Sequence, residues 1–415
     1  YGTGNDFGDG LFTRFLKYIT KKNLFWPTIY SAYTLSVLRE KGYDVDYKTE
    51  ISDDYDFYIF TSSVVTHETE IEKIKELHKK TKKILTIGPF ASNNSEKYLE
   101  AGSLVITNEP EFYFLKNKIE EINYENPKLL TDYEISNDVN LLPIPAWDIF
   151  MEKNALTYGI LSHELTIPLL ATRGCPYSCS HYCVYPLAQG KKVRARNPIN
   201  IVKEIEYWKK NFNVKKFVFR DPVFSINRKH TIELCNEIIN RKLNVNFIVE
   251  THLNNLDDEI LPLLKASGMN MVKVGIESAD EFVLQSSKRK SISVDQQMER
   301  IRKLEKLNIK VVAMYIIGML GDTVKTANAT INYAKKLNTY LAQCSIFTPY
   351  PGTPLYSEFK DKLITNKFED FNQYNLVFKH PEYTNDLARA TMNKFYNSYY
   401  LRLNWLFKFF KINYF

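Results

Sequence analysis

The stretch that decides the fold is TIPLLATRGCPYSCSHYC, residues 166–183. An apolar run of strand character turns at Gly174 into a loop that carries three cysteines, Cys175, Cys179 and Cys183. The 415-residue chain has five cysteines in all, an odd number that argues against a disulfide framework. Three thiols on one loop instead indicate metal or redox chemistry in a reducing compartment.

Five further strand patterns follow this one, each separated from the last by a helical pattern. The six strands lie at 166–173, 215–220, 245–250, 271–276, 310–317 and 342–349, and the helices near 199–211, 228–241, 257–266, 294–306 and 323–336. Six such units in register predict a barrel or three-quarter barrel, whose chemistry takes place at the carboxyl ends of the strands. Polar residues follow these strands directly: Arg173–Cys175, Asp221, Glu250–His252, Glu277–Ser278 and Gly318–Asp322.

The first 125 residues also alternate between strand and helix, which predicts a separate, doubly wound α/β domain. Its strands are expected at 45–51, 56–63, 83–89 and 103–109, and its helices at 29–42, 68–80 and 94–101. Such domains usually begin with a buried strand, whereas this chain opens with YGTGNDFGDG and no Met. We therefore expect the first strand and the true N-terminus to lie upstream.

The segment between the two α/β parts reads as a linker, because Pro143 and Pro145 favour extended chain and Trp147 can pack along a surface. No strand pattern follows the barrel, so the rest of the chain is expected to be helical. The predicted divisions are 1–125, 126–160, 161–356 and 357–415.

The chain ends in NWLFKFFKINYF, where Lys408 and Lys411 are interleaved with apolar residues. This segment is either a terminal helix that packs on the barrel or a helix that lies on a membrane surface or a partner. Packing is favoured, because short segments bind membranes weakly on their own.

Composition excludes several classes of protein. A hydrophobic fraction of 44% with 25% charged residues is that of a folded globular protein. The net charge of +7 is spread along the chain rather than concentrated, so no nucleic-acid partner is expected. No apolar run reaches the roughly 20 residues of a membrane span. We expect a cytoplasmic protein.

Three thiolates can hold a four-iron cluster and leave one iron open to a small molecule with amino and carboxylate groups. The alternative is a zinc site with His181 as the fourth ligand. Zinc sites favour paired cysteines with a second pair elsewhere, and the sequence has no second pair. Cys235, in a helical pattern, and Cys344, in a strand pattern, are expected to be buried apolar residues.

TRGCPYSCSHYCVYP resembles the cluster loop of the radical S-adenosylmethionine (SAM) superfamily. The spacing here is C-x3-C-x3-C rather than the common C-x3-C-x2-C, which leaves open whether His181 or Tyr182 lies over the adenine of SAM. The resemblance implies a [4Fe-4S] cluster on Cys175, Cys179 and Cys183, with SAM as cosubstrate.

Later motifs occur in the family's order over about 190 residues, and each implies a SAM contact. FRDPVFSIN places Asp221 near the SAM amino group. VGIESADEF places Glu277 and Ser278 near the ribose and carboxylate, with Lys288 or Arg289 as the positive residue that follows. YIIGMLGDT resembles the strand that supports the adenine, at Gly318, with Asp322 in place of the usual Glu.

FTPYPGTPLY is similar to a phrase of the cobalamin-dependent branch, and PTIYSAYTLSVLREKGYDVD and ITNEPEFYF resemble its cobalamin-binding domain. The resemblance implies cobalamin over two loops at the carboxyl ends of the first sheet. The candidate residues are Thr61, Ser62 and Ser63 in the loop 61–66, and Gly88 in the loop 88–92. Pro89 and Phe90 are expected to crowd the second loop, because a glycine usually stands there.

The cobalt-ligating pattern D-x-H-x-x-G is absent. His67 follows a strand without that context and is expected to face solvent or cap a helix. Two residues at the barrel's open end are candidate catalytic groups. His252 is a candidate proton donor or substrate contact, and Tyr350 a candidate substrate contact.

The resemblance implies reductive SAM cleavage followed by functionalisation of an unactivated carbon, with cobalamin-dependent methyl transfer as the preferred reaction. Radical cyclisation or rearrangement of the oxidative-cyclase type is the alternative, and a cobalamin- or cluster-binding regulator the non-enzymatic one. A tRNA methylthiotransferase is disfavoured, because no cysteine precedes Cys175. The expected partners are a small-molecule or lipid-like substrate and an electron donor such as flavodoxin or ferredoxin. Peripheral membrane contact stays open, and the substrate is not readable.

Overall fold

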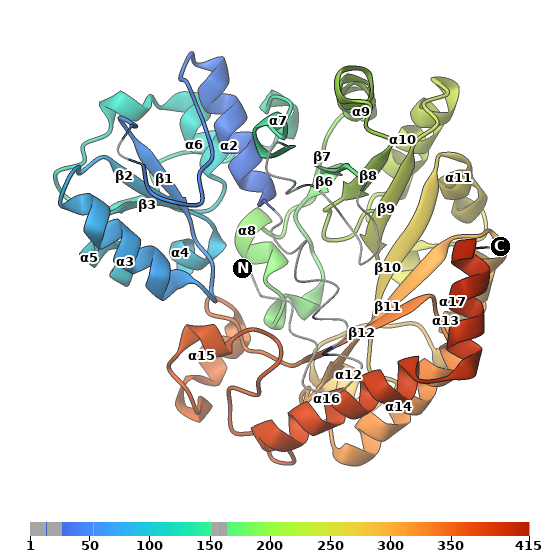
Figure 1. Ribbon diagram of the computed structural model, residues 1–415. Coiled ribbons are helices and arrows are strands. Elements are labelled where there is room, and N and C mark those ends of the chain that lie inside the picture. The colour runs from blue at the N-terminus through green and yellow to red at the C-terminus, as the bar shows by residue number, and fades with distance from the viewer. Residues whose placement is uncertain (1–13, 15–26, 53, 152–155, 157–163, 415) are drawn as a thin grey trace.

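A computed structural model describes residue 14 and residues 27–52, 54–151, 156 and 164–414 (Figure 1). The first part of the chain forms a four-stranded parallel sheet in the order β1-β2-β3-β4. Its strands are β1 (Tyr58–Thr61), β2 (Ile84–Ile87), β3 (Leu104–Ile106) and β4 (Leu129–Leu130).

Helices cover both faces of this sheet (Figure 1). On one face lie α2 (Ile29–Glu40) and α6 (Pro110–Lys116), and on the other α3 (His67–His78), α4 (Pro89–Asn93) and α5 (Glu96–Glu100). Because both faces are covered, every residue of β2 and β3 is buried. Helix α2 ends where Gly42 adopts a φ of 90°, a conformation that side-chain-bearing residues avoid.

Two features of this part differ from the sequence prediction. The segment 45–51 is not a strand, and β1 is the edge of the described sheet. Conversely, β4 lies inside the predicted linker and pairs in parallel with β3. The sheet thus extends past residue 125, and Trp147 is completely buried. Between β4 and the barrel follow the 3-10 turn η2 (Val139–Leu141) and α7 (Asp148–Met151), while η1 (Ile119–Glu121) precedes β4.

The second sheet is the predicted six-unit partial barrel. All six strands are parallel, in the order β5-β8-β9-β10-β11-β12, and β5 and β12 are its two edges. The strands are β5 (Thr166–Leu169), β8 (Lys216–Phe219), β9 (Asn246–Thr251), β10 (Met269–Glu277), β11 (Lys310–Ile317) and β12 (Leu341–Ile346).

Helices follow these strands on the outside of the barrel (Figure 1). They are α9 (Pro198–Phe212), α10 (Arg228–Asn240), α11 (Ile260–Ala266), α12 (Glu281–Ser286), α13 (Val294–Lys306) and α14 (Val324–Leu337), with a 3-10 turn η4 (Leu253–Asn255) before α11. The cysteine loop leaves β5 through β6 (Thr172–Arg173), continues through the 3-10 turn η3 (Ser178–His181) and α8 (Tyr185–Gln189), and returns in β7 (Arg194–Ala195), which pairs antiparallel with β6.

The C-terminal region is only partly helical. It contains α15 (Pro354–Glu358), the 3-10 turns η5 (Lys360–Lys362) and η6 (Phe368–Asp370), α16 (Asn385–Tyr400) and α17 (Leu403–Tyr414). Most of 359–384 is loop, which the sequence pattern did not indicate. One apolar core runs from Val64 and Phe90 of the first domain into the barrel, so the two parts pack as neighbours. None of the described helices combines the length and apolar character needed to cross a membrane.

Candidate functional site

The cysteine loop is held in one conformation by its own backbone. The amide of Cys175 donates to the carbonyl of Gly190 (3.1 Å), and that of Cys183 to the carbonyl of Cys179 (3.0 Å). Gly174 has a φ of 88°, and a Cβ atom there would collide with the carbonyl oxygen of Lys192. A glycine is therefore required directly before the first cysteine.

The three thiols fit a cluster better than a single ion. Cys175 and Cys179 are buried and Cys183 is half-buried, and burial raises the pKa of Cys183 to about 12. A tetrahedral zinc site needs sulfurs roughly 3.8 Å apart. The three cysteines are not among the groups of described residues whose potential ligand atoms all lie within 4.8 Å of one another. As they stand, the three thiols are thus not gathered closely enough to hold one zinc ion, which disfavours the zinc alternative.

Arg289 connects the cysteine loop to two barrel strands. One terminal nitrogen lies 3.8 Å from Sγ of Cys179 and donates to Nε2 of His252 (2.6 Å). The other donates to the carbonyl of Gly275 (3.0 Å) and lies 3.3 Å from the carboxylate of Glu277. A buried guanidinium in this position places a fixed positive charge beside a cluster ligand.

Glu277 ends β10 with a φ of 64°, a conformation that is strained for glutamate. A Cβ at Gly275 would collide with the Glu277 carboxylate and with Arg289, so the sequence G-I-E leaves room for this ion pair. Ser278 points elsewhere: its hydroxyl lies 3.2 Å from that of Thr330 and accepts from the amide of Asp280 (3.1 Å). These bonds fix the turn into α12.

The contacts of His252 argue against its predicted role as a proton donor. Arg289 can only donate, so Nε2 of His252 must accept, and the imidazole is neutral. Burial, followed by the charge of Arg289, lowers the pKa of His252 to about 3. The ring packs against Tyr177 of the cysteine loop with centroids 4.6 Å apart. The structure therefore favours His252 as a support for Arg289 and for the loop.

Asp221 follows β8 as predicted, but both of its carboxylate oxygens are occupied. They accept from the amides of Ala171 and Thr172 and from the Thr172 hydroxyl (2.7 Å). Burial raises the pKa of Asp221 to about 6, although the hydrogen bonds lower it. These contacts fix the junction between β5 and β6, directly before the cysteines. A contact with the SAM amino group stays a prediction.

The remaining predicted SAM residues lie in the cysteine loop or in segments that follow the barrel strands. Tyr182 packs edge-on against Phe347 at the end of β12 (centroids 5.2 Å apart). His181, its rival for the adenine position, lies between Lys288 (3.1 Å) and Glu358 (3.3 Å). Because His181 is held by these two contacts, Tyr182 is the better candidate for the residue that lies over the adenine of SAM.

Gly318 has a φ of 74° and donates its amide to Asp322 (2.8 Å). The same carboxylate accepts from the Thr323 amide, so Asp322 fixes the turn between β11 and α14. Tyr350 is buried in the loop after β12. In that loop Gly352 has a φ of 87°, and a Cβ there would come within 2.6 Å of Asn93 in α4.

The predicted cobalamin loops lie at the carboxyl ends of β1 and β2. The hydroxyl of Thr61 lies 3.1 Å from that of Ser31, and the Ser62 hydroxyl accepts from the amide of Ala91 (3.0 Å). The amide of Ser63 donates to Glu70 (3.0 Å). Gly88 has a φ of 112°, and a Cβ there would come within 2.7 Å of the Tyr30 hydroxyl. The turn therefore needs a glycine at this position.

Phe90 does not crowd this turn as predicted. It is buried and packs edge-on against Tyr98 and against Phe368 of the C-terminal region (centroids 6.5 and 5.3 Å). The side chain thus points into the contact between the first domain and the C-terminal loop.

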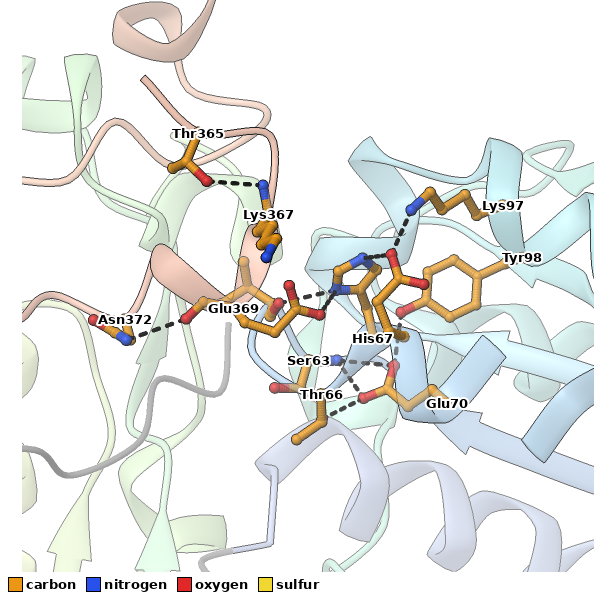
Figure 2. A network of polar contacts seen from close by, with 12 residues as sticks. Ser63, Thr66, His67, Glu70, Lys97, Tyr98, Thr365, Lys367, Glu369 and Asn372 are labelled. Atoms are coloured by element: carbon orange, nitrogen blue, oxygen red, sulfur yellow. Dashed lines mark hydrogen bonds and ion pairs between the residues drawn. The ribbon is translucent and has the colours of Figure 1, made fainter. Parts of the chain in front are cut away.

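His67 is buried, so the expectation that it faces solvent was wrong. Figure 2 shows it between the first domain and the C-terminal loop that carries Glu369. Nε2 lies 3.0 Å from Glu68, and Nδ1 lies 3.2 Å from the carbonyl of Val64 and 3.5 Å from Glu369. Its ring also packs against Phe368 (5.2 Å between centroids). Carboxylate oxygens thus lie within 3.5 Å of both ring nitrogens, so the imidazole is enclosed by residues of this contact.

Sequence reasoning missed a buried ion-pair network that joins the first domain to the cysteine loop. Arg173 of β6 pairs with both Glu109 and Glu111, and Arg194 of β7 pairs with Glu109. All four side chains are at least nine-tenths buried. The guanidinium carbon of Arg173 also lies 5.0 Å from the centroid of the Tyr33 ring. The sequence offered one signal of this network: ITNEPEFYF carries two carboxylates, Glu109 and Glu111, for which no partner had been predicted.

A cleft of about 240 Å³ opens beside this network. It is lined by residues of the loop after β3, including Asn108 and Glu109, and by α8 and the residues that follow it, including Pro186, Gln189 and Lys192. The cleft thus lies where the first domain meets the cysteine loop.

Residues 169–334 match the family model described as the radical SAM superfamily. Together with the cysteine loop at the start of a partial barrel, this match identifies residues 169–334 as a radical SAM domain, as the sequence indicated. The two-domain fold is similar to that of solved cobalamin-dependent radical SAM enzymes. A solved radical SAM methyltransferase, TsrM from Kitasatospora setae, with cobalamin and a [4Fe-4S] cluster bound, superposes with a TM-score of 0.65 at 17% identity, covering 81% of this chain and 72% of that one.

Two curated relatives are similar in sequence. An uncharacterized methyltransferase of Pyrococcus horikoshii is 28% identical over 277 residues, 65% of this chain and 58% of that protein. The anaerobic magnesium-protoporphyrin IX monomethyl ester cyclase of Cereibacter sphaeroides is 27% identical over 403 residues, 85% of this chain and 63% of that protein. The chain thus spans about three fifths of the length of these relatives.

Proposed function

We propose that this protein is a cobalamin-dependent radical SAM methyltransferase that acts on a small-molecule or lipid-like substrate in the cytoplasm. The observation that carries the proposal is the buried ion pair between Arg173 and Glu109. It joins the strand that enters the cysteine loop to the loop after β3, at the carboxyl edge of the first sheet. Ligands of such sheets lie at that edge.

The cofactors would supply the chemistry: a reduced [4Fe-4S] cluster the electron that cleaves SAM, and cobalamin a transferable methyl group. Cys175, Cys179 and Cys183 would hold the cluster, and the carboxyl-edge loops with Thr61, Ser62, Ser63 and Gly88 would hold cobalamin. The contribution of the protein is binding, orientation and the exclusion of water.

Several side chains have defined positions for these tasks. Arg289 and Glu277 form a fixed pair of opposite charges at the ends of the barrel strands, suited to the amino-acid part of SAM. Tyr182 offers a ring for the adenine, and Tyr350 a buried hydroxyl-bearing ring at the open end of the barrel. The family motifs imply two further SAM contacts, Lys288 and Ser278, although the Ser278 hydroxyl already bonds within the turn into α12. An electron donor such as flavodoxin or ferredoxin would reduce the cluster.

Radical cyclisation is the second candidate, because a cyclase matches 85% of this chain. The decisive experiment uses protein reconstituted anaerobically with iron, sulfide and cobalamin. It is incubated with a reductant, a panel of candidate substrates and SAM whose methyl group carries deuterium. A methyltransferase releases S-adenosylhomocysteine and gives a product that contains the deuterated methyl group. A cyclase gives 5′-deoxyadenosine and a product without that label, and a regulator consumes no SAM.

A further inference from the structure

Helix α17 displays an apolar stripe to solvent. Leu403, Leu406, Phe407 and Phe410 are 70%, 38%, 71% and 52% exposed, and their spacing of three, one and three residues places them on one face of the helix. With Leu401, they are five of the 13 exposed large apolar side chains among the described residues. Exposed apolar side chains gathered in this way mark an interaction surface.

The opposite face of α17 is already used to fix the helix to the barrel. The indole of Trp405 donates to the carbonyl of Tyr340 (3.0 Å), and Phe409 stacks on the Tyr340 ring (centroids 5.7 Å apart). Lys408 pairs with Glu305 of α13, and Asn413 accepts from Lys310 (3.0 Å). Because the inner face is occupied, the outer stripe cannot turn inward and is displayed in a fixed orientation.

The charges on and beside α17 favour an anionic partner for this apolar stripe. The helix, LNWLFKFFKINY, contains two lysines and no acidic residue. Lys408 is paired with Glu305, and Lys411 is exposed beside the stripe. Arg302 and Lys306 of the neighbouring helix α13 are exposed as well. Apolar and aromatic side chains flanked by basic ones are the composition of helices that lie in the interface of anionic membranes.

A second copy of the chain fits this surface less well. A stable dimer buries about 800 Å² on each partner, far more than a stripe of four or five side chains supplies. A symmetric pair of α17 helices would also bring Lys411 towards its own copy without a carboxylate on either helix to neutralise it.

We propose that α17 docks this protein on an anionic membrane surface. The inference goes beyond the proposed function and does not depend on it. The residues that anchor the helix, Lys310 and Tyr340, stand at the start of β11 and directly before β12. The membrane therefore lies at the amino end of the barrel, opposite the cysteine loop.

Sedimentation with phosphatidylcholine vesicles, with and without phosphatidylglycerol, tests the proposal on the full chain. We expect the protein to bind the phosphatidylglycerol vesicles and the double variant Phe407→Ser/Phe410→Ser to bind at least about tenfold more weakly. Lys411→Glu should lower the affinity for phosphatidylglycerol vesicles only. The matched control is Phe282→Ser, a phenylalanine that is 67% exposed on α12 and should leave binding unchanged.

Two measurements keep the test decisive. Circular dichroism and iron content after reconstitution should be the same for all variants, because none of the substituted side chains packs in the core. Light scattering without vesicles gives the oligomeric state. Absence of vesicle binding by the wild type, equal binding by the double variant, or a wild-type dimer that the double variant converts to a monomer would each overturn the proposal.

Discussion

Arg173 and Glu109 form a buried ion pair across the boundary between the cysteine loop and the first domain. Glu109 also binds Arg194, so one carboxylate holds both strands of the hairpin that frames the loop. Glu111 pairs with the same terminal nitrogen of Arg173, so the formal charges of the two arginines and two glutamates balance. The first domain and the hairpin before and after the cysteines are thereby joined directly.

The first prediction concerns this pair. Glu109→Gln leaves Arg173 and Arg194 with one carboxylate between them in a buried site, so the unfolding free energy should fall by about 3 kcal/mol. Glu134→Gln is the control, because Glu134 is exposed and pairs with Lys116 on the surface, and should change stability by less than about 0.5 kcal/mol. Urea unfolding of the two variants measures the difference. Equal midpoints would show that the network does not stabilise the fold.

The second prediction concerns the cluster. Anaerobic reconstitution should load about four irons and four sulfides per chain, because three thiolates with one open iron are the arrangement of a cubane cluster. Alanine at Cys175, Cys179 and Cys183 should remove the visible absorption of the cluster and all SAM cleavage. One tightly bound zinc per chain without sulfide would contradict the assignment.

The third prediction separates ligands from core cysteines. Cys235 is completely buried and accepts a hydrogen bond from Ser267 (3.3 Å), and Cys344 is completely buried in β12. Cys235→Ala and Cys344→Ala should therefore retain full iron content and lower the unfolding free energy by about 1 kcal/mol each. Iron analysis after reconstitution checks this, and a large loss in either variant would mean that the third ligand is misassigned.

The fourth prediction concerns Arg289. Arg289→Lys keeps the charge but loses the fork that reaches His252, Gly275 and Glu277 together. We expect unchanged iron content and at least about a tenfold loss in SAM cleavage, the equivalent of one lost charge-assisted hydrogen bond. Liquid chromatography of 5′-deoxyadenosine gives the rate. A rate equal to that of the wild type would leave Arg289 with a purely structural role.

The fifth prediction concerns His67 and cobalamin. The imidazole is held by Val64, Glu68 and Glu369, so His67→Ala should leave the amount of copurified cobalamin and its absorption spectrum unchanged. The spectrum should be that of cobalt without a protein histidine ligand. Loss of cobalamin in the variant would show that the histidine serves the cofactor, and its absence from the wild type would make the first domain a docking platform.

The sequence predicted the barrel well because its signals are local. The apolar periodicity at 294–306 and 310–317 defined α13 and β11 with the bounds found in the structure. The segment 45–51 has an equally good strand pattern and forms no strand, because a strand pattern does not by itself supply a pairing partner. A strand pattern shows only that a segment is able to form a strand. Whether it forms one depends on pairing with a neighbouring strand of the sheet.

The same distinction applies to the site. The order of the motifs along the chain placed the cysteines at the start of the barrel. That prediction needed only short-range patterns in the sequence. Arg173 and its partner Glu109 are 64 residues apart, and Asp221 and its partner Ala171 are 50 residues apart. No periodic pattern in the sequence predicts such contacts. For this reason the sequence suggested His252 as a proton donor or substrate contact, whereas Arg289, 37 residues further on, makes its Nε2 a hydrogen-bond acceptor.

The contact between Gly352 and Asn93 changes how the phrase PYPGTP can be used. The glycine is required for two reasons: its φ of 87° disfavours a side chain, and the Asn93 side chain of α4 packs directly against it. The phrase therefore records a tight turn beside a neighbouring domain rather than a step of the reaction.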